Sequence, residues 1–136
     1  MVRISVLLAV LSLAAPAPVA ARSVSDILRD ATRCFAAYDA AYKAAELNLN
    51  PIAKSGLAPQ RHNWLSLMQT IARIASVGKS KADIASIAGW QARLYRRQYA
   101  RVVQSIATGD AAVFTEVHDM CLRVKEEIRA AISEAR

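Results

Sequence analysis

Apolar side chains recur every three or four residues along four segments of the chain. These segments run approximately from Val24 to Leu47, Pro59 to Val77, Lys81 to Thr108 and Ala111 to Ala135. A 3.6-residue repeat is typical of amphipathic α-helices, whereas a half-buried strand alternates apolar and polar residues. The pattern therefore predicts four helices and no strand, which is an all-α fold.

Glycines and prolines separate the four segments and locate the connections between them. The residues that mark these connections are Pro51, Gly56 and Pro59, then Gly78, then Gly109. We expect the second helix to begin at Pro59, because the first turn of a helix tolerates the missing N–H of proline. Gly89 lies inside the third segment, which leaves open whether that helix is continuous or broken.

Within each segment the apolar residues lie on one side. In the first segment they are Val24, Ile27, Ala31, Cys34, Phe35, Tyr38, Ala41, Tyr42 and Ala45, and in the second Trp64, Leu67, Met68, Ile71, Ile74 and Ala75. In the third they are Ile84, Ile87, Ala88, Leu94, Tyr95, Val102 and Ile106, and in the fourth Val113, Phe114, Val117, Met120, Cys121, Val124, Ile128, Ala131 and Ile132. Such stripes predict that each helix contributes one face to a shared core.

Short connections between amphipathic helices favour an up-down-up-down four-helix bundle. Cys34 and Cys121 both lie on apolar stripes, at similar depths from one end of the bundle if the first and last helices are antiparallel. We therefore expect one structural disulfide that links the first and last helices, since an even pair of cysteines in an exported chain is usually bonded. Two buried free thiols are the alternative.

Residues 1–21 have the features of a secretory signal peptide. Arg3 supplies the positive charge, an apolar run extends from Ile4 to Ala15, and the small residues of positions 19–21 form a cleavage pattern that ends at Ala21. The run is too short to cross a bilayer, although an uncleaved anchor is the rival interpretation. The sequence thus predicts a periplasmic protein without a membrane span, whose residues 22–136 form a single domain.

Composition and charge narrow the class of protein further. The chain is 54% hydrophobic and 21% charged, as in ordinary globular domains, which excludes a disordered or collagen-like protein. The formal net charge is +7. A basic protein attracts anionic partners. Nucleic acid is not the anionic partner we expect, because the chain is predicted to be exported.

Signatures of catalysis, metal binding and haem attachment are missing from the sequence. There is no glycine-rich phosphate loop, no Gly-x-Ser-x-Gly, no His-Glu-x-x-His and no Cys-x-x-Cys-His. The two histidines, His62 and His118, are far apart and lie on or near polar faces, which makes zinc or haem ligation unfavourable. We expect no enzyme activity, no metal and no cofactor.

One surface departs from an evenly mixed charge pattern. Between Ile84 and Gly109 there is no acidic residue, yet the stretch contains Arg93, Arg96, Arg97 and Arg101, with Trp90 and Tyr99 nearby. Guanidinium groups next to aromatic rings suit carboxylate, phosphate or sulfate partners. A charged face that only maintains solubility is the simpler interpretation. Gln91 and Gln98 fall among the apolar positions of the same helix, where buried amides need partners.

These observations favour a non-enzymatic protein that presents helix faces to another periplasmic protein, as an adaptor, inhibitor or chaperone. A binder of anionic envelope molecules, such as lipid phosphates or acidic glycans, is the alternative, with the residues around Arg93–Arg101 as the binding surface. A bundle that carries a cofactor is the third hypothesis. The sequence does not distinguish partner or oligomeric state.

Overall fold

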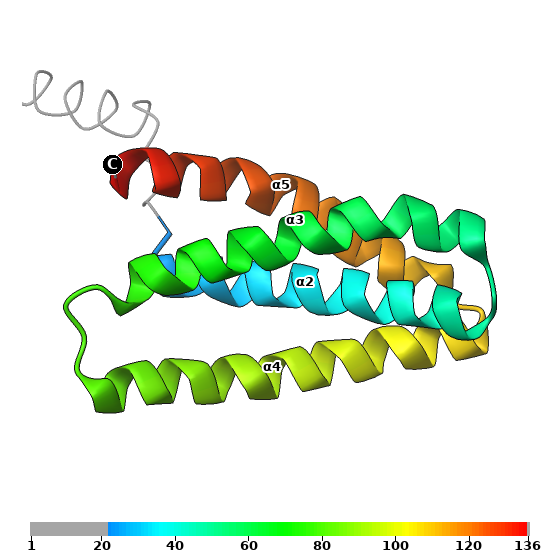
Figure 1. The fold of residues 1–136 in the computed structure, drawn as a ribbon, viewed down its shortest axis with the longest axis horizontal. Coiled ribbons are helices and arrows are strands. Elements are labelled where there is room, and N and C mark those ends of the chain that lie inside the picture. Colours follow the sequence, from blue (N-terminus) through cyan, green and yellow to red (C-terminus); the bar gives the residue numbers. More distant parts are fainter. Residues whose placement is uncertain (1–21, 136) are drawn as a thin grey trace, which may run out of the picture.

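A computed structural model describes residues 22–135 of the chain as four helices and no strands (Figure 1). The helices are α2 (Val24–Leu47), α3 (Pro51–Ser76), α4 (Lys81–Thr108) and α5 (Ala111–Ala135). They run alternately up and down, which confirms the predicted four-helix bundle. The predicted signal peptide, residues 1–21, lies outside the described residues.

The ends of α2 and α4 follow from local side-chain chemistry. The hydroxyl of Ser23 accepts a hydrogen bond from the backbone N–H of Asp26, and Ser80 does the same for Asp83, so each serine caps a free N–H of the first turn. Gly109 ends α4 in the left-handed conformation, with a φ of 73°. Helix α4 continues through Gly89 without a break.

The start of α3 differs from the prediction: the helix begins at Pro51 and not at Pro59. The side chain of Asn50 accepts a hydrogen bond from the N–H of Ala53 and caps the helix one residue before Pro51, where a proline is tolerated. Pro59 lies inside the helix on an exposed side. Water can therefore hydrate the carbonyl of Ser55, which proline leaves without its usual backbone donor.

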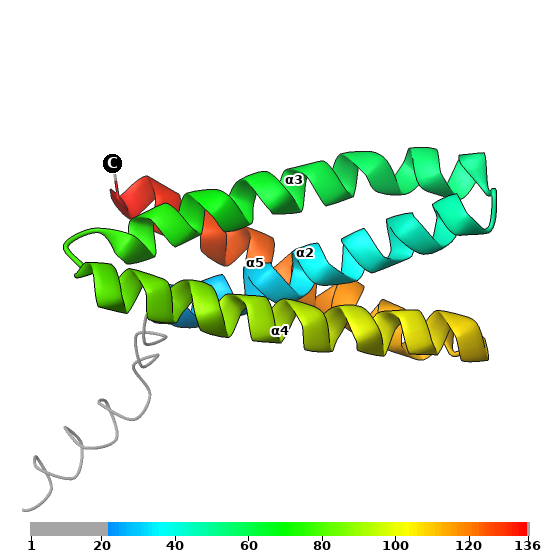
Figure 2. The same cartoon turned by 60° about the horizontal axis from the view of Figure 1, so that its bottom comes forward.

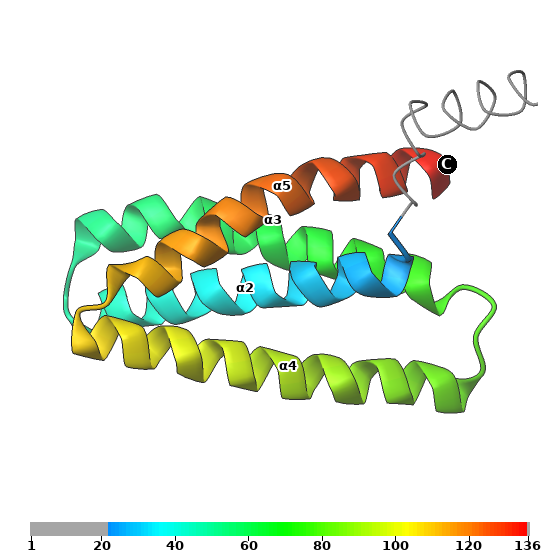
Figure 3. The same ribbon diagram turned by 180° about the vertical axis from the view of Figure 1, so that it is seen from behind.

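Helix α2 occupies the centre of the bundle and packs against the other three helices (Figures 1 and 3). Its buried residues are therefore not confined to one stripe. They are Ile27, Leu28, Asp30, Ala31, Thr32, Cys34, Ala36, Ala37, Tyr38, Asp39, Ala40, Ala41 and Ala45. The many alanines let three neighbouring helices approach the same backbone closely, because an alanine side chain ends at Cβ.

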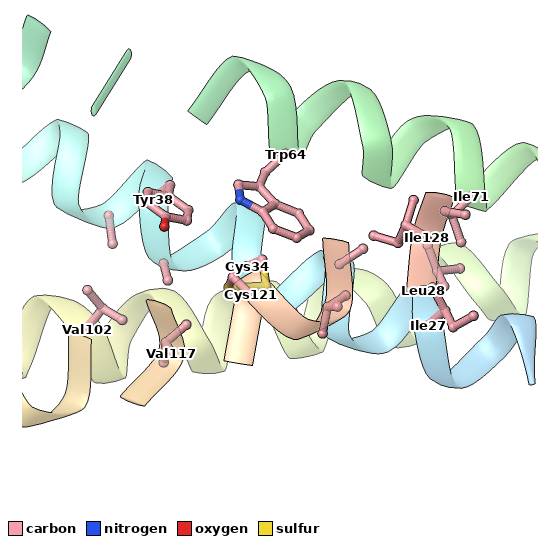
Figure 4. Close-up of a cluster of buried hydrophobic side chains, with 14 residues drawn as sticks. Ile27, Leu28, Cys34, Tyr38, Trp64, Ile71, Val102, Val117, Cys121 and Ile128 are labelled. Atoms are coloured by element: carbon pink, nitrogen blue, oxygen red, sulfur yellow. A yellow bond between two sulfur atoms is a disulfide. The ribbon is translucent and has the colours of Figure 1, made fainter. Parts of the chain in front are cut away.

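The predicted disulfide between Cys34 of α2 and Cys121 of α5 is confirmed, with a Cα–Cα distance of 5.8 Å. Both cysteines are fully buried in the core. Figure 4 shows the indole of Trp64 projecting from α3 toward this disulfide. The bond therefore joins the central helix to the last helix in the middle of the apolar cluster.

Helices α3 and α4 are neighbours in sequence but hardly approach one another, because they lie on opposite sides of α2 (Figure 2). As a result the predicted apolar stripe of α4 is only partly covered. Ile84 and Ile106 keep 40% and 38% of their surface exposed, Ala88 is also exposed, and Val102 is fully buried. The expectation that the whole stripe faces the core was wrong, since a stripe is buried only where another helix covers it.

None of the described helices is long and apolar enough to cross a membrane.

Candidate functional site

The arginine face is the outward side of α4 that carries Arg93, Arg96, Arg97 and Arg101. All four residues are exposed, and they lie within about two helical turns. Arg93, Arg97 and Arg101 are four residues apart, so their Cα atoms follow one another at intervals of about 6 Å along the helix. Because the opposite side of α4 packs on α2, this row of charges is presented by an anchored helix.

Only one of these four arginines forms an ion pair among residues 22–135. Arg101 lies 3.7 Å from the carboxylate of Glu116 on α5, and both side chains remain about half exposed or more. Arg93, Arg96 and Arg97 have no carboxylate within ion-pair distance in the described part of the chain. The face therefore holds three uncompensated positive charges.

The two aromatic residues near the arginine face are less available than the sequence suggested. Trp90 and Tyr99 are half-buried and pack against the core. The ring of Tyr99 lies 5.7 Å from that of Tyr95, and the ammonium group of Lys43 sits 5.7 Å from the Tyr99 ring centroid. These rings pack between α4 and the core. The guanidinium groups of the arginines are therefore the part of this face that a partner can contact.

A polar network that the sequence analysis missed joins α2, α3 and α4. Its centre is Asp39 of α2, whose side chain is 3% exposed. The carboxylate accepts hydrogen bonds from Nε of Arg61 on α3, at 2.6 Å, and from the hydroxyl of Tyr95 on α4. Lys43 lies 3.7 Å away on the same helix. The network thus connects α3 and α4 through a side chain of the central helix.

The network shifts the pKa values of Asp39 and Tyr95 in opposite directions. Burial opposes the charge on Asp39, but the hydrogen bonds from Tyr95 and Arg61 and the nearby Lys43 outweigh it, so the pKa of Asp39 is lowered. Burial and the hydrogen bond to Asp39 raise the pKa of Tyr95 well above its ordinary value. At neutral pH the pair is therefore a carboxylate that accepts and a hydroxyl that donates.

The two glutamines of α4 behave differently from one another. Nε2 of Gln91 donates a hydrogen bond of 3.2 Å to the hydroxyl of Thr32, which in turn donates to the carbonyl of Leu28. Gln98 is 5% exposed, and its Nε2 has no hydrogen-bond partner among the described residues. The amide of Gln91 therefore fixes the alignment of α2 and α4. Burial of the Gln98 amide costs free energy, because it loses its hydrogen bonds to water.

Both histidines lie at the surface of the bundle. His62 is exposed, as the sequence indicated. His118 of α5 is also exposed, and its Nδ1 shares a hydrogen bond of 2.6 Å with the hydroxyl of Tyr38. Within residues 22–135, no group of three or more His, Cys, Asp or Glu side chains is placed to hold a metal ion.

In comparisons with known proteins, no family model, curated sequence or solved structure matches this chain.

Proposed function

We propose that this protein is a non-enzymatic interaction protein that binds an acidic surface of another protein through the arginine face of α4. The observation that carries the proposal is the set of three exposed arginines, Arg93, Arg96 and Arg97, with no ion-pair partner among the described residues. Four like charges on adjacent turns repel one another, and a carboxylate-rich partner removes that repulsion.

The spacing of the arginines suits carboxylates on a partner helix. Acidic residues four positions apart on a helix are also separated by about 6 Å, which matches the interval between Arg93, Arg97 and Arg101. The Arg101–Glu116 pair is an example of such a contact between neighbouring helices inside this chain. Arginine can contact a carboxylate with two parallel hydrogen bonds, which favours a defined orientation of the partner.

We further propose that the protein is exported to the periplasm and that the signal is removed after Ala21. The contacts of Arg22, the next residue, are compatible with this because they make Arg22 part of the folded domain. Its guanidinium group bonds to Asp30 and to both carboxylate oxygens of Glu127, at 3.1 and 2.8 Å, so this residue holds the start of α2 against α5. Intact-mass measurement of the periplasmic protein should give a chain that begins at Arg22, and retention of residues 1–21 would refute export by cleavage.

The test of the proposed function compares two variants with equal net charge. In the first, Arg93, Arg97 and Arg101 become Gln; in the control, the exposed Arg29, Arg123 and Arg129 become Gln. Native complexes are captured from a periplasmic extract by each variant and by the parent. The face variant should lose a protein partner that the control retains, and partner binding by the parent should weaken as salt rises.

Other outcomes separate the alternatives. Equal capture by both variants would show that the arginines only keep the protein soluble. Retention of lipid phosphate or acidic glycan by the parent, with no protein, would favour the envelope-binding hypothesis. A visible absorption band in the purified native protein would favour a bundle that carries a cofactor.

A further inference from the structure

The end of the bundle at the α3–α4 connection contains a hollow that is open to solvent, with a volume of about 420 Å³. It lies between the last turns of α3 and the first turns of α4. Its lining residues are Ala72, Arg73, Ser76, Val77, Ile84, Ile87, Ala88 and Gln91.

Small side chains and the separation of α3 from α4 create this hollow. Ala72 and Ala88 line it from the two helices, and Ile84 and Val77 remain 40% and 78% exposed beside it. Gln91 is engaged with Thr32, so its amide is already satisfied. The surface is therefore mainly apolar, and water gains few hydrogen bonds there.

Positive charge lies next to the apolar surface. Arg73 lines the hollow, and Lys79 and Lys81 lie in or next to the connecting turn. None of these three cations has an ion-pair partner in the described part of the chain. Asp83 is the single carboxylate between residues 72 and 91; it is not part of the lining, but it lies one turn before the lining residue Ile87 on the same side of α4.

The dimensions decide which kind of ligand fits. From Ile84 to Gln91 the wall of α4 is about 10 Å long. A helix of a partner protein is itself about 10–12 Å wide with its side chains, so it would lie over the hollow without filling it. A single alkyl chain is much narrower and fits along such a surface, and a chain longer than about 10 Å continues past its end. The positive charge of Arg73 next to this surface then favours an anionic head group over a neutral or cationic one.

We propose that this hollow binds a single-chain anionic amphiphile of the fatty-acid class, with the alkyl chain against Ile84, Ile87 and Ala88 and the head group on Arg73. The site is distinct from the arginine face, and it does not depend on the proposed protein partner. The ligand enters as a free monomer from solvent, to which the hollow is open.

A second hollow at the opposite end provides the contrast. It is also mainly apolar, with a volume of about 380 Å³, but its polar lining includes Asp110 and no lysine or arginine. A carboxylate repels an anionic head group. Charge therefore distinguishes the two hollows.

Displacement of dansyl-undecanoic acid from the full folded protein tests the proposal. Dodecanoate should displace this fluorescent probe, whereas dodecanol and dodecyltrimethylammonium should do so at least about tenfold more weakly, because they lack the charge-assisted contact with Arg73. Probe binding below the micelle concentration distinguishes free monomers from lipid aggregates. Binding only to anionic phospholipid vesicles, with no monomer binding, would overturn the proposal.

Matched variants locate the site. Ala88→Leu fills the hollow and Arg73→Gln removes its cation, and each should weaken the probe about tenfold or more. Ala92→Leu, one turn further along α4, and Arg93→Gln, on the arginine face, should bind as the parent does. Circular dichroism verifies that each variant is folded. Equal binding by Ala88→Leu and the parent, or loss of probe binding as the protein concentration rises, would overturn the proposal, the second by placing another copy in the hollow.

Discussion

The carboxylate of Asp39 in the central helix accepts a hydrogen bond from Nε of Arg61 at 2.6 Å, across the interface with α3. The same carboxylate accepts a second hydrogen bond from Tyr95 on α4. Because α3 and α4 hardly touch, this side chain provides a polar connection between two helices that share little apolar contact. The arrangement makes one acidic residue important for the spacing of three helices.

Replacing Asp39 by Ala should destabilise the protein. The change leaves Arg61 and Tyr95 without their acceptor, and we expect the free energy of unfolding to fall by about 2–3 kcal/mol. The loss is smaller than for a fully buried pair because about a third of the Arg61 side chain is exposed. Urea denaturation measures it. Glu126→Ala, which removes an exposed carboxylate, should change stability by no more than about 0.5 kcal/mol.

The contribution of Asp39 should disappear in acid. Its folded-state pKa is lowered below the ordinary value of 3.8, so the stabilisation is present above that value and is lost as pH falls through the folded-state pKa. The stability difference between the parent and Asp39→Asn should therefore be constant near neutral pH and shrink below pH of about 4. Denaturation midpoints from neutral to strongly acidic pH test this. A difference that stays constant into strong acid would contradict the lowered pKa.

Reduction of the Cys34–Cys121 disulfide should lower the stability markedly. The bond connects residues 87 positions apart in sequence, and loss of a native disulfide in a small domain costs about 2–5 kcal/mol. The double variant Cys34→Ala, Cys121→Ala should show the same lower thermal midpoint with and without reductant. Two titratable thiols in the unreduced native protein would contradict the bond.

Gln98 offers a route to a more stable protein. Its Nε2 is buried without a hydrogen-bond partner among residues 22–135, so Gln98→Met, which keeps a similar shape, should raise the free energy of unfolding by about 1 kcal/mol. Gln91→Met is the matched control on the same helix. Since Gln91 donates a hydrogen bond to Thr32, its replacement should not raise the free energy of unfolding. Equal effects of the two substitutions would show that the Gln98 amide does find a partner.

The pattern of apolar residues along the chain was sufficient to predict where most of the helices begin and end. The 3.6-residue repeat and the breaks at Gly78 and Gly109 predicted the bounds of α2, α4 and α5 correctly, because these signals act within one or two turns. The start of α3 was missed, since Pro59 carries a strong local signal and the Asn50 cap upstream is a competing one. The positions of the four arginines on one helix could also be predicted from their spacing.

The sequence by itself determined four amphipathic helices, the pairing of Cys34 with Cys121 and the row of positive charge along α4. Only the tertiary structure decided that α2 is central, that Asp39 is buried, and that Ile84 borders an open hollow. Periodicity shows which face of a helix is apolar. It does not show which of the other helices will cover that face, because this depends on how all four pack together.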